Sequence, residues 1–448
     1  MTVRRRYYFW LFKAYLKKWR MVILTSILAG IVGFFLFVGI LQLYIQPLIL
    51  KDTQTIGFEG VVTPLTIPDS ILEDISYGLT KVANDGKIVP AASQSWEIRN
   101  NGKQYIFHLK KGQYFHNGDE LTADNIPLEF KEATVKKIDK YTVVYDLQEQ
   151  YAPFLASVAK PLLLDNFEGL GDYKFNDVGV NGGFIKELEL VHTKDKKKRK
   201  KIIFYPSEDA LKTAFLLGDV DKVVDVKDPT FKNQDLGKWK RVKVTKSIDR
   251  SNLVTLFYNT QDDILSEKKV RLALHNAVPE TFSQGQRTYG SIPEDSVFFT
   301  RTINYGIIDE ELAKTYLEGA SFDSKKTTLT ISTTKEYEQI AKIIQASWAK
   351  IGIKSKIEIV QKIPDKFQIF LYSFSVKADP DQYVLWHSSQ KNNISLYKNL
   401  RIDKLLEDGR VTTDPKERMS IYADFQKYLL DDAPASFLYY PTVYTISR

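Results

Sequence analysis

The chain contains no cysteine among its 448 residues. This absence excludes a disulfide framework, and it also excludes a lipid anchor attached through a cysteine thiol. Stability must therefore come from burial of apolar surface, and 44% of the residues are hydrophobic. Because a chain of this length is too long for one hydrophobic core, we expect two or more lobes.

Reactive motifs are missing as well. The sequence has no GxSxG, HExxH or GxxxxGK[ST] motif, which would mark a nucleophile, a zinc site or a phosphate-binding loop. Its histidines have no metal-ligand spacing. They are His108, His116, His192, His275 and His387. We therefore expect no enzyme activity, no metal centre and no cofactor, and the sequence points to a binding protein.

Acidic residues are absent from residues 1–20, and charged residues of either sign are absent from residues 21–50. The apolar stretch exceeds the about 20 residues that a membrane-spanning helix needs. Its predicted anchor residues are Met21, Ile31, Phe35 and Ile45. Because basic residues stay on the cytoplasmic side, we predict a cytoplasmic segment (1–20), a transmembrane anchor (21–50) and a body on the extracellular or periplasmic side of the cell membrane.

A cleaved signal peptide is the alternative interpretation of this segment. Signal peptides have an apolar region of about 7–15 residues and a small-x-small cleavage site. The stretch here is longer, and it ends in QPLILKDTQ, which offers no such site. The sequence therefore favours an uncleaved, single-pass anchor.

Net positive charge is concentrated at the start of the chain. Residues 1–20 carry seven of the eight net charges, which leaves +1 for residues 51–448. A nearly neutral body gives no support for binding nucleic acid. Its one strong basic run, residues 193–201, lies between two strand patterns. This run is interpreted either as a solvated hairpin tip or as a contact to anionic lipid or wall polymer.

Apolar periodicity predicts alternating strands and helices in the body. Strands are expected at 95–99, 104–112, 141–147, 201–206, 252–260, 328–333, 354–361 and 367–374. Helices are expected at 207–218, 266–278, 309–320, 335–352 and 414–432. The last begins with a strong start signal, Asp414 followed by Pro415, and Ser207 is a weaker cap. Strand–helix–strand alternation over 201–375 predicts α/β lobes, and the stretch 88–150 predicts a separate, mostly β piece.

Five blocks carry a resemblance to a known family. Residues 75–126 include DGKIVP, SWE, FHLKKG and FHNGDELTADN, and they predict a hairpin turn at Asn101 and Gly102, a turn at Gly112, and a helix that begins at Thr122 or Asp124. The other blocks are 209–226, 256–278, 341–360 and 378–441. In this order they resemble the family-5 extracellular solute-binding proteins, the oligopeptide- and dipeptide-binding components of ABC transporters.

The resemblance implies an α/β fold, a two-lobed periplasmic-binding-protein type II clamp with an extra β-rich subdomain. The expected divisions are lobe I at 51–265 with the subdomain at about 76–170, lobe II at 266–424, and a return to lobe I at 425–448. It also implies capture of a peptide or another small solute and delivery to ABC permease subunits. The alternative is a surface receptor, sensor or interaction protein that uses the same clamp.

Candidate ligand contacts lie on residues 373–381 and 386–389 of the resembling blocks, at Asn259 and at Tyr397. Trp386 would supply an apolar wall with one donor, and Asn259, His387 and Ser388 would supply polar contacts. The full predicted set is Asn259, Ser375, Asp379, Asp381, Trp386, His387, Ser388 and Tyr397. A structural role competes with this interpretation, because Trp386 could belong to the core and the two aspartates could cap a helix.

One position departs from the family's pattern. Peptide-binding members carry an aspartate three residues before the acidic-Pro pair, and it anchors the α-amino group of the ligand. This sequence has Val376 at that place, followed by Lys377. An apolar side chain cannot pair with an ammonium ion, so either another acid such as Asp379 replaces the contact or the ligand is not a plain peptide.

Overall fold

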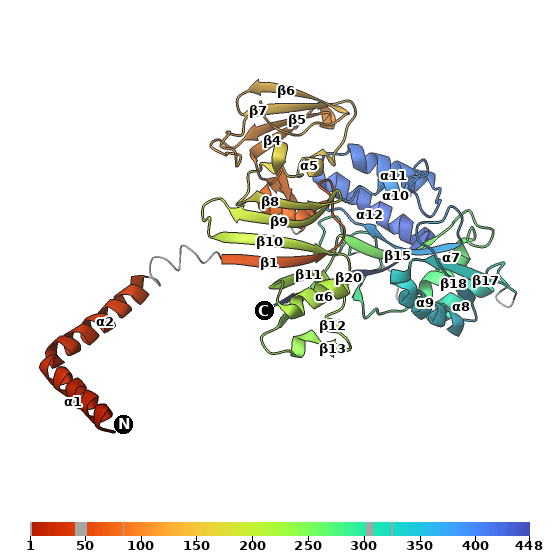
Figure 1. The fold of residues 1–448 in the computed structure, drawn as a ribbon. Helices are drawn as coiled ribbons and strands as arrows, with labels where there is room; N and C mark the ends of the chain where they lie inside the picture. The colour runs from red at the N-terminus through yellow and green to blue at the C-terminus, as the bar shows by residue number, and fades with distance from the viewer. Residues whose placement is uncertain (1, 41–51, 84, 302–307, 324–325) are drawn as a thin grey trace.

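The N-terminal part of the chain forms two helices that precede the body. The computed structural model describes residues 2–40, 52–83, 85–301, 308–323 and 326–448. Helices α1 (Thr2–Lys18) and α2 (Arg20–Ile40) stand apart from the rest of the fold (Figure 1).

Helix α2 carries most of the predicted anchor. Its stretch Arg20–Gly39 is long and apolar enough to cross a membrane, a property that cleaved signal segments share. Met21, Ile31 and Phe35 are exposed on α2, and their role as anchor residues stays a prediction. Ile45 lies outside the described residues.

A 12-stranded sheet runs through the body in the order β18-β17-β19-β15-β20-β11-β1-β10-β9-β8, with β14 and β16 also paired to β20 (Figure 1). We call the two halves lobe I and lobe II. The lobe I strands are β1 (Asp52–Glu59), β8 (Tyr173–Asn181), β9 (Phe184–His192), β10 (Lys198–Tyr205), β11 (Lys222–Val226) and β14 (Lys243–Ile248). The lobe II strands are β15 (Asn252–Tyr258), β16 (Gly285–Arg287), β17 (Thr328–Thr333), β18 (Lys354–Ile359) and β19 (Ile369–Ser375).

The last strand, β20 (Ala435–Ser447), belongs to both lobes. Its first half pairs with β15 and β16, and its second half pairs with β11 and β14. The change of partners falls at Pro441, which has no N–H to give to a ladder. The chain crosses between the lobes a second time at residues 249–251, between β14 and β15.

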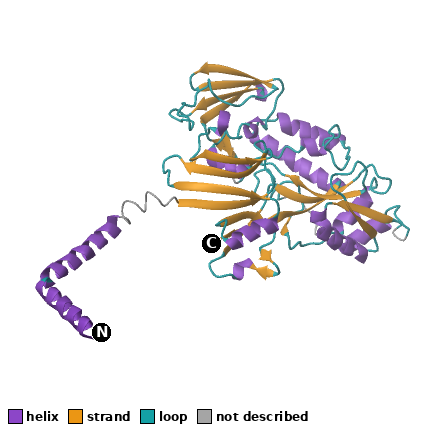
Figure 2. Ribbon diagram, in the orientation of Figure 1, coloured by secondary structure: helices purple, strands orange, loops and turns teal. Residues whose placement is uncertain are grey.

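Helices cover both faces of the lobe II sheet (Figure 2). Along β15, Val254 and Leu256 face one hydrophobic core, whereas Leu253 and Phe257 face another. This alternation explains why the strand is apolar at nearly every position. The first core includes residues of α7 (Lys268–Asn276), α8 (Glu310–Glu318) and α9 (Glu338–Lys350), and the second includes residues of α10 (Tyr383–Trp386), α11 (Leu400–Val411) and α12 (Pro415–Asp432).

Lobe I carries the smaller elements. Helix α6 (Glu208–Leu217) packs on β1 and β11, and Ser207 caps it by accepting the Ala210 N–H. The others are α4 (Asp69–Ile75), β2 (Thr80–Val82), β3 (Ile88–Pro90), β12 (Thr230–Phe231) and β13 (Gln234–Asp235). A separate sheet in the order β4-β5-β7-β6 forms the β-rich subdomain. Its elements are β4 (Ser93–Arg99), β5 (Gln104–Leu109), β6 (Ala133–Asp139), β7 (Thr142–Leu147) and α5 (Phe154–Ser157).

The predicted elements are confirmed with one exception. Each of the eight expected strands and five expected helices overlaps an observed element of the same type, and the basic run 193–201 includes the turn between β9 and β10. The prediction of a helix that begins at Thr122 or Asp124 is wrong. Residues 122–125 form a turn in which Asn125 Oδ1 accepts the Thr122 N–H, and Pro127 disfavours helix at the residue before it. The expected lobe boundaries at 265/266 and 424/425 stay predictions.

A buried polar chain lies inside lobe II, between α7 and the strands β15 and β20. His275 Nδ1 on α7 lies 2.9 Å from Ser436 Oγ on β20, which lies 2.7 Å from the Tyr258 hydroxyl on β15. Burial, together with the positive charge of Arg287, lowers the pKa of His275 to about 4. The neutral imidazole is therefore the form that the folded chain holds.

This shift predicts acid sensitivity. The pKa of an unfolded histidine is about 6.5, so between about pH 6.5 and pH 4 the unfolded chain binds a proton that the folded chain does not. Stability falls as pH falls through that window, by roughly 3 kcal/mol in total. We expect H275Q to remove this part of the pH dependence in urea unfolding of the full chain. The control H108Q, on the partly exposed His108, should keep it; equal slopes in H275Q and the wild type would contradict the prediction.

Candidate functional site

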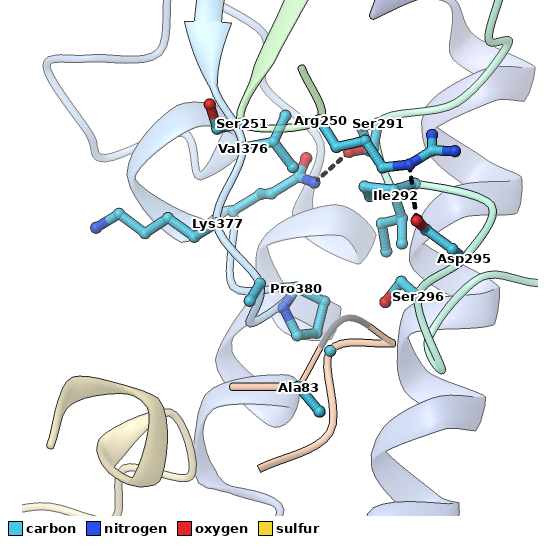
Figure 3. A pocket seen from close by; sticks show the side chains of 14 residues that line it. Ala83, Arg250, Ser251, Ser291, Ile292, Asp295, Ser296, Val376, Lys377 and Pro380 are labelled. Carbon is cyan, nitrogen blue, oxygen red and sulfur yellow. Dashed lines mark hydrogen bonds and ion pairs between the residues drawn. The ribbon is translucent and has the colours of Figure 1, made fainter. Parts of the chain in front are cut away.

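A cavity of about 230 Å³ lies beside the crossing at residues 249–251. Three other segments complete it: the β2–β3 connection of lobe I, the stretch 291–296 of lobe II, and the loop 376–382 that follows β19 (Figure 3). Its lining residues are Ala83, Gly86, Arg250, Ser251, Ser291, Ile292, Pro293, Asp295, Ser296, Val376, Lys377, Ala378, Pro380 and Gln382. Because both lobes and one crossing segment contribute, closing or opening the lobes would reshape this space.

Direct bonds hold the lobes together around the cavity. The Val297 N–H of lobe II donates to the Asp85 carbonyl of the β2–β3 connection at 3.1 Å. On another edge, Lys227 of lobe I pairs with Glu336 of lobe II at 2.6 Å. Lobe II also contacts the β-rich subdomain, where the Ala152 N–H donates to the Arg410 carbonyl at 2.6 Å.

The polar groups of the cavity are partly paired. Arg250 Nε lies 2.7 Å from Asp295 Oδ2, and Gln382 Nε2 donates to the Ser291 carbonyl at 3.0 Å (Figure 3). The Lys377 side chain extends away from the Arg250–Asp295 pair. The buried Ser291 Oγ has no hydrogen-bond partner among the described residues. It is a hydroxyl that a ligand could satisfy.

The loop 376–382 is held by a buried ion pair. Both terminal nitrogens of Arg418, on α12, donate to the Asp379 carboxylate at 2.7 Å. Burial alone would lower the pKa of Arg418, but the hydrogen bonds and charge of Asp379 outweigh it and raise that pKa. Burial also raises the pKa of Asp381, against the opposing charge of Arg410, whose Nε lies 3.2 Å away. These contacts position Val376, Ala378 and Pro380 against the cavity.

The eight predicted ligand-binding residues are not brought together at this cavity. Ser375, Asp379 and Asp381 adjoin or belong to the loop 376–382, but their side chains are not among the lining groups. Asn259 lies at the far end of β15 from the crossing, where its Nδ2 donates to the Phe367 carbonyl at 2.8 Å. Its distance from the loop follows from the register, which pairs Asn252, and not Tyr258, with Ser375.

The other four predicted residues sit in the connection around α10 and α11. Trp386 is 1% exposed, and its Nε1 donates to Gln382 Oε1 at 2.9 Å. His387 lies 3.3 Å from Glu407, and the Ser388 N–H donates to Asp403. The buried Tyr397 donates its hydroxyl proton to Asp432. Their role as ligand contacts stays a prediction.

None of the lining residues belongs to the predicted set, although three predicted residues adjoin or belong to the loop 376–382. Arg250 and Ser251 lie just before the apolar strand β15, in SIDRSNLVTLFY, and this polar stretch is the one signal that could have revealed the crossing. Residues 291–296 and Gly86 carry no such signal, because only the tertiary fold brings them to the cavity. Clusters of metal-ligating side chains are absent from the described parts of the chain.

Two lobes joined by crossing segments around a small cavity define the class: a solute-binding clamp. The comparisons give the family. Residues 87–133 and 127–395 match the family model "Bacterial extracellular solute-binding proteins, family 5 Middle". The chain therefore belongs to the family-5 extracellular solute-binding proteins, as the sequence blocks predicted, and it is a binding protein and not an enzyme.

Individual relatives agree with this assignment. The oligopeptide-binding protein AppA of Bacillus subtilis is 25% identical, over 83% of this chain and 81% of its own. The dipeptide-binding protein of Escherichia coli K12 is 24% identical, over 80% and 82%. The crystal structure of the ABC transporter substrate-binding protein CtaP of Listeria monocytogenes superimposes with a TM-score of 0.74 at 20% identity, over 89% of this chain and 94% of that one. The predicted fold class is thereby confirmed.

The Arg418–Asp379 pair gives a test of how the loop is held. Removing one partner of a buried ion pair typically costs about 3–5 kcal/mol, because the other charge is left uncompensated. We expect D379N to lose stability of that order in thermal or urea unfolding. D381N should lose less, because the Arg410 side chain is 30% exposed. The double variant D379L/R418M removes both charges and should recover most of the loss; a double variant as unstable as D379N would contradict this account.

Proposed function

We propose that this chain is the membrane-anchored, extracytoplasmic solute-binding subunit of an ABC importer, and that it captures its ligand in the cavity beside residues 249–251. The observation that carries the proposal is the composition of that cavity, whose walls come from both lobes and from a crossing segment. A ligand that contacts both walls stabilises the closed arrangement over the open one, and a permease can tell these two states apart.

The anchoring half of the proposal rests on α2. A helix of this length and apolarity suits a bilayer, and seven basic residues and no acid lie at its N-terminal side. A cysteine-free chain has no thiol for a lipid anchor. We propose that α2 stays attached and keeps the clamp close to its permease.

The ligand is proposed to be a short peptide or another small solute. The two curated relatives named above are an oligopeptide- and a dipeptide-binding protein. The cavity offers main-chain groups, the Arg250–Asp295 pair and the unpaired Ser291 hydroxyl, and it places Val376 in the wall. In this proposal Asp379 and Asp381 act mainly by holding the loop 376–382.

Ligand capture is tested by thermal unfolding of the full chain in detergent micelles with pools of short peptides and of other small solutes. A ligand at about 100 times its dissociation constant should add about 2.7 kcal/mol to the free energy of unfolding. We expect at least one pool to raise the melting temperature. If no pool does so, and mass spectrometry finds no co-purified solute, the clamp serves as an interaction protein and the proposal fails.

The residue at position 376 gives a sharper test. V376D places a carboxylate in the cavity wall, where it can accept charge-assisted hydrogen bonds from an α-ammonium group, worth about 1.5–3 kcal/mol. We therefore expect V376D to prefer a peptide with a free amino terminus over its N-acetylated form by about tenfold or more. The wild type and the uncharged control V376N should show no such preference. Titration calorimetry with the matched peptide pair measures it, and equal affinities in V376D would show that the amino terminus binds elsewhere.

A further inference from the structure

We propose that residues 193–198, which comprise the turn between β9 and β10 and the first residue of β10, are a docking surface for anionic lipid headgroups on the outer face of the membrane. We call this segment the lysine tip. The inference rests on the anchoring part of the proposed function and adds a second contact between the body and the bilayer.

The charges of the basic run divide into two groups. At its base, Arg199, Lys200 and Lys201 pair with Glu189, Asp74 and Glu187. In the lysine tip, all four lysines are exposed, and none forms an ion pair with another described residue. They are Lys194, Lys196, Lys197 and Lys198. The base thus belongs to the fold, whereas the tip presents uncompensated positive charge.

Acidic neighbours offset only part of the charge of the lysine tip. Asp195 is the one acid within it, and it shapes the turn: its Oδ1 accepts the Lys197 N–H and its carbonyl accepts the Lys198 N–H. Asp52 and Asp172 flank the tip and also contact it through main-chain bonds. The segment 193–198 still carries +3, whereas residues 51–448 together carry only +1. A generally basic surface does not account for the tip.

The strand register places the lysine tip beside the entry of the chain into the body. Asp52, the first residue of β1, lies opposite Lys198 in the parallel pair β1–β10. The Asp52 N–H donates to the Lys197 carbonyl at 3.0 Å. Figure 1 shows the start of β1 and the β9–β10 turn at the same end of the sheet. The tip therefore points to the side from which α2 joins the body.

The length of the connecting chain keeps the lysine tip within reach of the bilayer. Helix α2 ends at Ile40 and β1 begins at Asp52, so eleven residues join them. An extended chain spans at most about 3.3–3.6 Å per residue, which gives roughly 40 Å as the upper limit. A tethered group meets its partner at high effective concentration. Lysine clusters beside the cytoplasmic end of a membrane span bind anionic lipid, and the same attraction acts on the outer face where that leaflet is anionic. A protein with the same lysine tip but without a membrane anchor would not have this high effective concentration at the bilayer.

Docking through the lysine tip would set the orientation of the clamp. Strands β1 and β10 run in parallel away from the tip. The cavity borders the crossing at residues 249–251, at the join between the lobes and not at the tip. With the tip on the membrane, the lobe I strands stand between the bilayer and the cavity, and the cavity stays open to solutes.

The absence of native cysteine makes the test direct, because T193C gives one labelling site in the full chain. Full-length T193C with a donor fluorophore is reconstituted in phosphatidylcholine vesicles, with and without phosphatidylglycerol, that contain an acceptor-labelled lipid headgroup. We expect energy transfer to rise when phosphatidylglycerol is present. The rise should disappear in high salt, because salt screens exposed charges. It should also disappear when the four lysines of the tip are changed to glutamine.

The matched control changes four exposed lysines of lobe II to glutamine, namely Lys356, Lys362, Lys366 and Lys391. It alters net charge equally and should leave the rise intact. The proposal is overturned if energy transfer is the same with and without phosphatidylglycerol, or if the rise persists in the tip variant. It is also overturned if energy transfer rises only when a polyglycerol phosphate wall polymer is added. Failure of every variant to float with vesicles would instead refute the anchor, so the two failures are distinguishable.

Discussion

The fold depends on one strand that both lobes share. Strand β20 pairs with β15 and β16 in lobe II and with β11 and β14 in lobe I, so neither half has a complete sheet without it. The lobes can therefore move only by bending at β20 and at residues 249–251. The cavity lies beside that second crossing. A movement of a few degrees there changes the distance between its walls, which is how a hinged binding protein reports that it is loaded.

The buried aspartates of the loop 376–382 have a different role from the one that their residue type suggests. Aspartates in a loop after a strand are natural candidates for contacting a ligand, and the competing interpretation from the sequence was that they cap a helix. In the fold, Asp379 pairs with Arg418 and Asp381 with Arg410, so both carboxylates are occupied by the protein. What remains at the cavity is the shape of the loop and the apolar Val376. Under the proposed function, the walls and a few polar groups would set the selectivity for the ligand.

Elements with strong periodicity could be predicted from the sequence, and those whose form depends on distant partners could not. The apolar residues on both faces of β15 and the Asp414 cap of α12 are local signals, and the sequence predicted both elements. Strand β20 was missed because Pro441 interrupts its pattern, and its role as a shared strand is visible only in three dimensions. The prediction of a helix after Thr122 was wrong because it considered the capping residue and not the effect of Pro127 on the residue before it. Trp386 shows the limit for the site, since a core tryptophan and a ligand-stacking tryptophan have the same local sequence.

The place at which β1 begins has a mechanical consequence. Strand β1 lies parallel to β10 with eight residue pairs in register, and its first residue is the point where the chain enters the body. A pull on the chain at Asp52, directed along the strand, loads all the inter-strand hydrogen bonds of this ladder at once, in shear. Bonds loaded together resist far more force than bonds that peel apart one after another. With the proposed anchor in place, this geometry would suit a body that experiences drag, because the chain enters the body on a strand that is paired along its whole length with β10.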